Sequence, residues 1–171
     1  MRDAVDVLLD QWRVQRPDLD PTPMGVVGRI SRASRLIDRN LKDHFGEEDV
    51  EPWEFDVLAT LRRSGPTSRL TAGELVASAM VTSGAITNRI DRLVARGLVT
   101  RDVDPANRRQ VLIELTDAGR DLVDHLVEGH LDNERRMLSS LSDREQAQLA
   151  GLLRKLLVAH GDSGGPPGAT R

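Results

Sequence analysis

The stretch from Thr82 to Leu115 carries a group of side chains that can bind an anionic partner. Between Ser83 and Gln110 six arginines stand against three aspartates, so this segment has a formal charge of +3. The whole chain of 171 residues has a formal net charge of −3, which leaves −6 for the remainder. A basic segment in an otherwise acidic chain predicts a localised contact with double-stranded DNA.

The spacing of apolar residues in the first part of this segment predicts a helix whose exposed side is polar. Ile86, Ile90, Leu93 and Val94 recur at helical spacing and define its buried side, and Gly97 ends it. A helix of this kind contacts base edges from its N-terminal end and phosphates from its outer face. The residues expected to contact DNA from this helix are Ser83, Gly84, Thr87, Asn88 and Arg92.

A basic hairpin is expected to follow this helix. Residues 99–103 and 110–115 read as two strands, and residues 104–109 form the loop between them. Arg108 and Arg109 in this loop are suited to enter a minor groove or to clamp phosphates. An arginine pair in a loop can also be a solvated turn, but its position directly after the helix favours DNA contact.

A second helix is expected just before the first, which completes a helix-turn-helix motif. Thr71 and Glu74 have the spacing of a capping box, and the apolar residues that follow give a short helix its buried side. Residues 80–82 then form a tight turn. Two short helices joined in this way are typical of a DNA-binding motif.

Three further residues suggest a site that faces inward. Arg89 falls at the margin of the buried arc and needs a counter-charge, for which Asp56 and Asp91 are the candidates. Asp56 borders the apolar side of a helix over 51–64, where a surface or capping carboxylate is the alternative. Trp12 lies on the apolar side of a helix over 3–15, either as a packing anchor or as a wall that stacks on a ligand.

The flanking segments supply the remaining helices of a mainly α fold with a small β-hairpin wing. Leucine-rich patterns predict a long helix over 22–46 and a C-terminal pair that packs antiparallel, all suited to dimerisation. The expected organisation is an extra N-terminal helix (1–16), a dimerisation helix (22–46), a winged DNA-binding lobe (50–115), C-terminal dimerisation helices (116–160) and a disordered tail (161–171).

Composition excludes several other classes of protein. The chain contains no cysteine, so disulfides, thiol nucleophiles and cysteine-ligated zinc are ruled out. Its four histidines do not form a convincing metal site, and it carries neither a Gly-rich phosphate loop nor a catalytic carboxylate pair. We therefore expect no enzyme activity and no cofactor. The N-terminus lacks a secretory pattern and no apolar run is long enough to span a membrane, so the expected location is the cytoplasm.

The run from Glu51 to Val123 resembles the MarR family of winged helix-turn-helix regulators. The resemblance is carried by ITNRIDRLVARGLVTR, by the wing DPANRRQVLIEL and by LTDAGRDLV at the start of the next helix. It implies a homodimer with entwined terminal helices that represses transcription from a pseudo-palindromic operator. One departure is Asn107, where the common wing pattern has an aspartate, so a wing-stabilising ion pair is in doubt.

A narrower resemblance is to the urate-responsive branch of the family, the PecS-like and TamR-like regulators. It implies ligand-binding roles for Trp12, Asp56, Arg89 and Arg101. A small anion held by Arg101 would displace Asp56 from Arg89 and release the operator. Urate is the first choice because a flat purine stacks on tryptophan, and trans-aconitate or a citrate-like tricarboxylate is the second. A constitutive DNA-binding protein without an effector is the alternative from another class.

Overall fold

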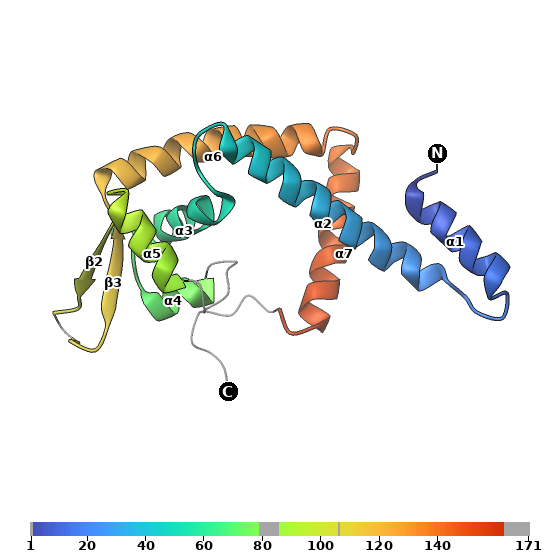
Figure 1. Cartoon of the computed structure of the whole chain (residues 1–171), viewed down its shortest axis with the longest axis horizontal. Coiled ribbons are helices and arrows are strands. Elements are labelled where there is room, and N and C mark those ends of the chain that lie inside the picture. The colour runs from blue at the N-terminus through green and yellow to red at the C-terminus, as the bar shows by residue number, and fades with distance from the viewer. Residues whose placement is uncertain (1, 79–85, 106, 163–171) are drawn as a thin grey trace. The chain divides into compact units, whose positions relative to one another are not determined.

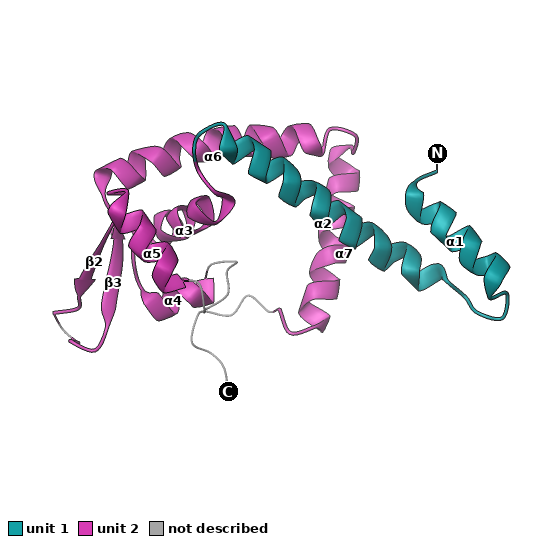
Figure 2. Cartoon of the chain, in the orientation of Figure 1, with its two compact units in different colours: residues 1–49 teal, residues 50–171 magenta. Residues whose placement is uncertain are grey.

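The computed structural model describes residues 2–78, 86–105 and 107–162. The chain divides into two compact units, residues 1–49 and 50–171, which are coloured separately in Figure 2. Each unit is described by itself below. In the part of the chain that the structure describes, no helix is both long enough and apolar enough to cross a membrane.

The first unit is a pair of helices, α1 (Ala4–Gln15) and α2 (Thr22–Gly46). Val5 and Leu9 of α1 are buried against α2, where a Cβ added to Gly25 would lie 3.2 Å from Leu9 Cδ1. The missing side chain therefore lets the two helices approach closely. Arg29 of α2 donates hydrogen bonds to two carboxylates at the start of α1, those of Asp3 and Asp6.

The second unit combines a small antiparallel sheet with helices (Figure 1). It contains three short strands in the order β1-β3-β2, with both pairings antiparallel. Its elements in chain order are α3 (Pro52–Arg63), β1 (Arg69–Thr71), α4 (Ala72–Ser78), α5 (Ile86–Ala95), β2 (Val99–Val103), β3 (Val111–Leu115), α6 (Asp117–Met137) and α7 (Asp143–Ala159).

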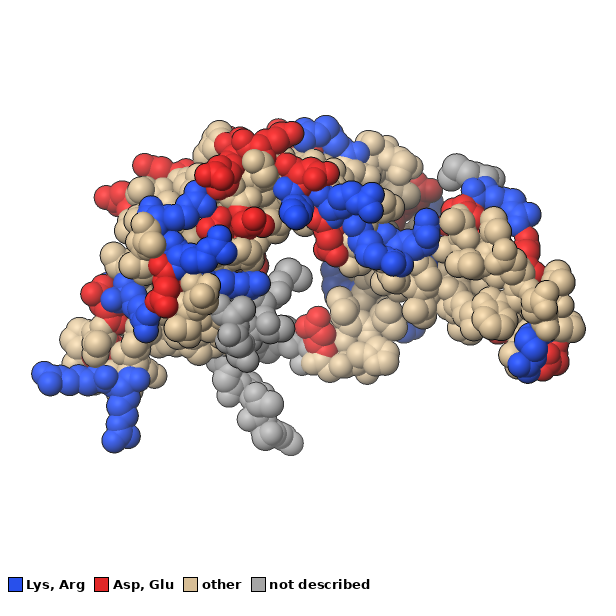
Figure 3. All heavy atoms as spheres, viewed as in Figure 1, with Lys and Arg blue, Asp and Glu red and all other residues tan. Residues whose placement is uncertain are grey.

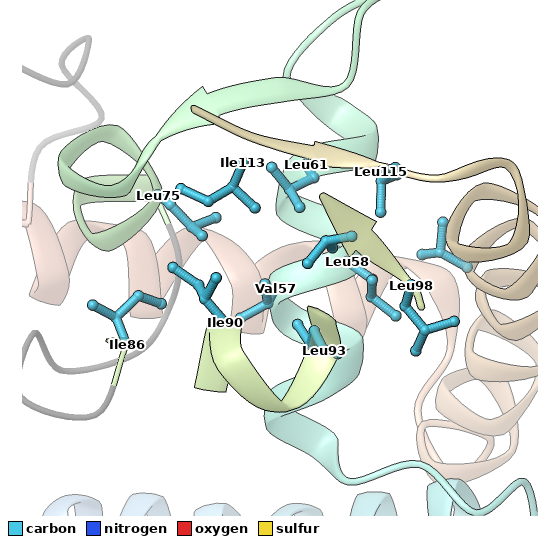
Figure 4. Close-up of a cluster of buried hydrophobic side chains, with 12 residues drawn as sticks. Val57, Leu58, Leu61, Leu75, Ile86, Ile90, Leu93, Leu98, Ile113 and Leu115 are labelled. Atoms are coloured by element: carbon cyan, nitrogen blue, oxygen red, sulfur yellow. The ribbon is translucent and has the colours of Figure 1, made fainter. Parts of the chain in front are cut away.

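One core of aliphatic side chains holds the helices and strands of the second unit together (Figure 4). Side chains of α3, α4 and α5 point toward one another there, and they meet Ile113 and Leu115 from β3. Many of these residues are fully buried, including Val57, Leu58 and Leu93 at 0% exposure. The apolar arc predicted for α5 is confirmed for Ile86, Ile90 and Leu93, whereas Val94, which was also assigned to it, is 40% exposed. The three buried residues fix which side of that helix faces outward.

Three expectations about elements are corrected by the structure. Strand β1 was not predicted, because three residues are too few to show alternation, yet Leu70 pairs with Ile113 of β3. In the sequence, Gly46 reads as the C-cap residue of the long helix over 22–46. In the structure it is the last residue of α2 and has no positive φ, so it does not act as a left-handed cap. Helix α7 turns away from α6 instead of folding back along it (Figure 1), and none of its residues is buried. The predicted disordered tail falls mostly on residues 163–171, outside the described part of the chain.

Candidate nucleic-acid interface

Helix α5 presents polar side chains on the side opposite the core. Thr87, Asn88 and Arg92 are exposed, whereas Ile90 and Leu93 of the same helix are 3% and 0% exposed. Hydrogen-bonding groups on one side of a short helix can reach base edges and phosphates in a major groove. The other two residues predicted for this surface, Ser83 and Gly84, lie outside the described residues.

The loop between β2 and β3 forms a closed turn with both arginines on its outside. The Asp104 N–H donates to the Gln110 carbonyl at 3.0 Å, and the Gln110 N–H donates to the Asn107 carbonyl at 2.8 Å. Arg108 and Arg109 are exposed, and basic side chains project from this end of the sheet in Figure 3. Two cations held on a narrow projection suit phosphate contact or insertion into a minor groove.

Asn107 has a defined role in this turn. Its side-chain Oδ1 accepts the Arg109 backbone N–H at 3.2 Å, which is the hydrogen bond of an Asx-turn. An aspartate would accept the same hydrogen bond but would add a negative charge beside the two arginines. The asparagine therefore keeps the turn and leaves the basic loop with its full positive charge.

Arg101 and Asp91 form an ion pair between β2 and α5. The Arg101 Nη1 lies 2.6 Å from Asp91 Oδ1, and the two side chains are 43% and 58% exposed. Exposed pairs of this kind contribute at most about 1 kcal/mol. A ligand can therefore recruit Arg101 at small cost. From the sequence, Asp91 was one candidate partner for Arg89. In the structure it forms an ion pair with Arg101.

Arg89 does not form the predicted ion pair with Asp56. Its guanidinium carbon lies 5.3 Å from the centre of the Trp53 ring, and Arg92 lies over the same ring at 4.8 Å. The buried Nη1 of Arg89 has no hydrogen-bond partner among the described residues. Asp56 is half-buried on α3, where its carbonyl accepts the Thr60 hydroxyl at 2.7 Å.

Trp12 belongs to the first unit and lines an apolar groove there. The ring is 45% exposed, and the groove has a volume of about 410 Å³ between α1 and α2. Its other walls are aliphatic, from Val5, Leu8, Leu9, Pro23, Met24 and Val27. Asp56, Arg89 and Arg101 belong to the second unit, so a joint ligand site with Trp12 stays a prediction.

Two residues that sequence reasoning did not assign to the site lie behind α5. Trp53 stacks under Arg89 and Arg92, and the buried Glu54 accepts Arg96 Nη1 at 2.8 Å. The available signal was the spacing of Arg89, Arg92 and Arg96, which places all three on one side of the helix. The partner element is not visible in that spacing.

Two short helices, α4 and α5, followed by a basic β-hairpin on a three-stranded sheet define a winged-helix DNA-binding protein. The tight turn predicted over 80–82 lies outside the described residues. Residues 48–110 match the MarR family. The chain is 42% identical over 149 residues to the transcriptional regulator PecS of Dickeya dadantii, which covers 87% of this chain and 90% of that protein. The chain therefore belongs to the MarR family.

Solved structures of relatives agree with this assignment. A variant of Escherichia coli MarR bound to operator DNA superposes with a TM-score of 0.70 at 29% identity, over 81% of this chain and 98% of that one. Bordetella bronchiseptica BpsR, whose DNA binding is regulated by 6-hydroxynicotinic acid, superposes with a TM-score of 0.69 at 27% identity, over 77% and 91%. The relatives are transcriptional regulators, and the chain is a MarR-family DNA-binding regulator of transcription.

Proposed function

We propose that this protein is a homodimeric repressor that binds a pseudo-palindromic operator and leaves it when a small anion binds. The single observation that carries the DNA role is the exposed, basic β2–β3 turn with Arg108 and Arg109, next to the polar outer side of α5. These two surfaces address a groove and its flanking phosphates together. We propose that it acts in the cytoplasm, for which its proposed DNA target is the support.

The proposed dimer rests on apolar surface at both ends of the chain. Leu152 is 67% exposed on α7 and Val27 is 66% exposed on α2, each within its own unit. Large apolar side chains exposed together on one element are a mark of protein interfaces. A second copy is the occupant we propose, because two lobes are required to address two half-sites of a symmetric operator.

The proposed ligand is a flat anion, with urate as the first choice. Arg89 offers a buried guanidinium N–H without a partner among the described residues, and Arg101 is tied up only by an exposed ion pair. A planar anion accepts paired hydrogen bonds from guanidinium groups, and Trp12 offers an exposed ring for stacking. BpsR responds to 6-hydroxynicotinic acid, also a planar ring acid, which supports the class of ligand.

The proposed release mechanism places Asp56 at the switch. An anion that engages Arg89 and Arg101 brings negative charge into the half-buried region near α3, where it opposes the Asp56 carboxylate. The coupling required is modest, since allosteric regulators typically shift affinity by about 1–3 kcal/mol. Displacing Arg89 or the Asp91–Arg101 pair would change the contacts that hold α5 and β2.

Ligand titration tests this proposal. Operator binding is measured by gel shift on DNA upstream of the protein's own gene, with urate, trans-aconitate or citrate added, and tryptophan fluorescence reports ligand binding in parallel. We expect urate to release the DNA at the lowest concentration and Asp56→Asn to weaken that response. A tricarboxylate that acts at lower concentration would replace urate. Unchanged binding with every ligand would favour a constitutive DNA-binding protein.

A further inference from the structure

Two arginines of α5 and a third just after its last residue all contact the first turn of α3. Arg89, Arg92 and Arg96 follow one another at i, i+3 and i+7, which places them on the same side of the helix. Arg89 and Arg92 lie over the ring of Trp53, and Arg96 binds the neighbouring residue, Glu54. Two consecutive residues of α3, Trp53 and Glu54, therefore contact all three arginines.

The Trp53 ring is a fixed platform. It is half-buried and packs against the aliphatic core formed by α3, α4, α5 and the sheet. The two guanidinium carbons lie 5.3 and 4.8 Å from its centre, within the range in which an aromatic ring attracts a cation. Two like charges share one ring here, and the negative potential of its faces offsets part of their mutual repulsion.

The Glu54 carboxylate is buried and accepts two hydrogen bonds. Its side chain is 2% exposed, and Oε2 accepts both the Arg96 guanidinium at 2.8 Å and the Glu51 backbone N–H at 2.9 Å. The second hydrogen bond closes a capping box at the start of α3, where the helix dipole also stabilises negative charge. Arg96 is thereby tied to the backbone of α3.

We propose that Trp53 is a positioning residue for DNA binding, which orders Arg92 for a phosphate contact and, together with Glu54, fixes the orientation of α5. The inference rests on the proposed DNA-contacting role of α5. Stacking occupies the flat side of a guanidinium group and leaves its N–H donors free at the edge. Arg92 is exposed, so these donors can reach a phosphate oxygen while the ring restricts the side chain to one orientation.

The same ring links the two kinds of arginine on α5. Arg89 belongs to the proposed ligand site, and Arg92 belongs to the proposed DNA surface. A ligand that pulls Arg89 from Trp53 removes one of two cations that share the ring, which changes the surroundings of the other. Trp53 is in this way a physical connection between ligand binding and a DNA contact one helical turn away.

The test compares operator affinity and its salt dependence across matched variants, on a duplex that the wild-type protein selects from a random pool. We expect Trp53→Leu to lower affinity about three- to ten-fold, with Trp53→Phe between it and wild type, since phenylalanine attracts cations less strongly than tryptophan. The slope of log affinity against log salt should fall by about one unit, as for one lost phosphate contact. Val76→Ala, which truncates another side chain at the edge of the same core, is the control and should keep the wild-type slope.

A double-mutant cycle separates positioning from general destabilisation. If Trp53 acts through Arg92, Trp53→Leu costs less affinity in the Arg92→Ala protein than it costs in the wild-type protein. Full additivity, or an unchanged salt slope for Trp53→Leu and Trp53→Phe, overturns the inference while the DNA-binding function stands. If the wild-type protein selects no duplex at all, the proposed function fails and the inference fails with it. Urea unfolding of each variant confirms that affinities are compared between folded proteins, and Trp53→Phe carries the test if Trp53→Leu does not fold.

Discussion

Gly119 lies in the first turn of α6, where that helix crosses the backbone of Leu98. A Cβ at this position would be 2.0 Å from the Leu98 carbonyl oxygen, which no side-chain rotation can relieve. The approach is reinforced by Thr116, whose N–H donates to the Leu98 carbonyl and whose hydroxyl donates to that of Gly97. The base of the basic β2–β3 hairpin is thus bound to α6 through backbone groups.

Gly119→Ala should therefore destabilise the protein by about 1–3 kcal/mol or more, the usual cost of overpacking a close contact. Urea unfolding measures the change. Gly73→Ala is the matched control, because an added Cβ there meets nothing within 4 Å. The control should be neutral or slightly stabilising, since alanine restricts the unfolded chain more than glycine does. Equal unfolding midpoints for the two variants would contradict the proposed contact.

Asp124 and Arg62 link α6 to α3 by an ion pair at 2.7 Å. The hydrogen bond from Arg62 lowers the pKa of the Asp124 carboxyl below its ordinary value. Since the folded pKa is the lower one, the pair's stabilisation is present at neutral pH and is lost as pH falls through that folded pKa. Asp124→Asn should thus reduce stability at neutral pH and make no difference in strong acid.

Unfolding of Asp124→Asn and wild type across a pH series checks this expectation. Asp121→Asn, on the same helix, removes the same charge from an exposed position and controls for the change in net charge. A deficit in Asp124→Asn that persists unchanged into strong acid would mean that packing, and not the ion pair, causes it.

The β2–β3 turn is the element whose charge most directly sets DNA affinity. Arg108→Ala should weaken operator binding and lower the salt slope by about one unit, as expected for a lost phosphate contact. Asn107→Asp should keep the turn, because aspartate accepts the same N–H, yet weaken binding through its added negative charge. Gel shifts at several salt concentrations test both variants. The proposed role of the turn is rejected if Arg108→Ala binds as wild type does at every salt concentration.

At the scale of elements, sequence periodicity predicted most of the second unit. Helices α3 and α5 and strand β3 each bury one side in a shared core, so each carries a repeat that can be recognised alone. Strand β2 buries only Val99 there. The capping box predicted at Thr71 forms, and a second capping box forms at Ser142. Strand β1 was not predicted, because its three residues form a strand only through pairing with β3, which is a tertiary contact.

The candidate site was harder to predict from the sequence than the fold was. The position of Arg89 at the margin of the buried arc was correct in kind, since the residue is half-buried. Its neighbour on α3 was not predictable, because the choice between Trp53 and Asp56 depends on how α3 and α5 cross. Neither helix encodes that crossing in its own pattern. Resemblance to a family supplied residue roles but not this contact.

At the scale of the whole molecule, the apolar side of α7 is the surface that the proposed dimer would cover. No residue of α7 is buried within the chain, yet Leu149, Leu152 and Leu156 recur along one side of it at 43%, 67% and 44% exposure. Burying apolar surface contributes about 25 cal/mol per Å², so leaving this side of α7 in water loses several kcal/mol of stabilising free energy. A second copy that covers it would make folding and dimerisation mutually dependent.

Leu152→Glu should consequently shift the protein from dimer to monomer and sharply weaken operator binding, because two linked lobes bind two half-sites far more tightly than one lobe binds one. Light scattering coupled to size exclusion measures the mass, and gel shifts on full and half operators measure the affinity. Ala147→Glu adds the same charge on the opposite, exposed side of α7 and should remain dimeric. If Leu152→Glu stays dimeric with full affinity, α7 lies outside the dimer interface, and the apolar surface of α2 becomes the remaining candidate.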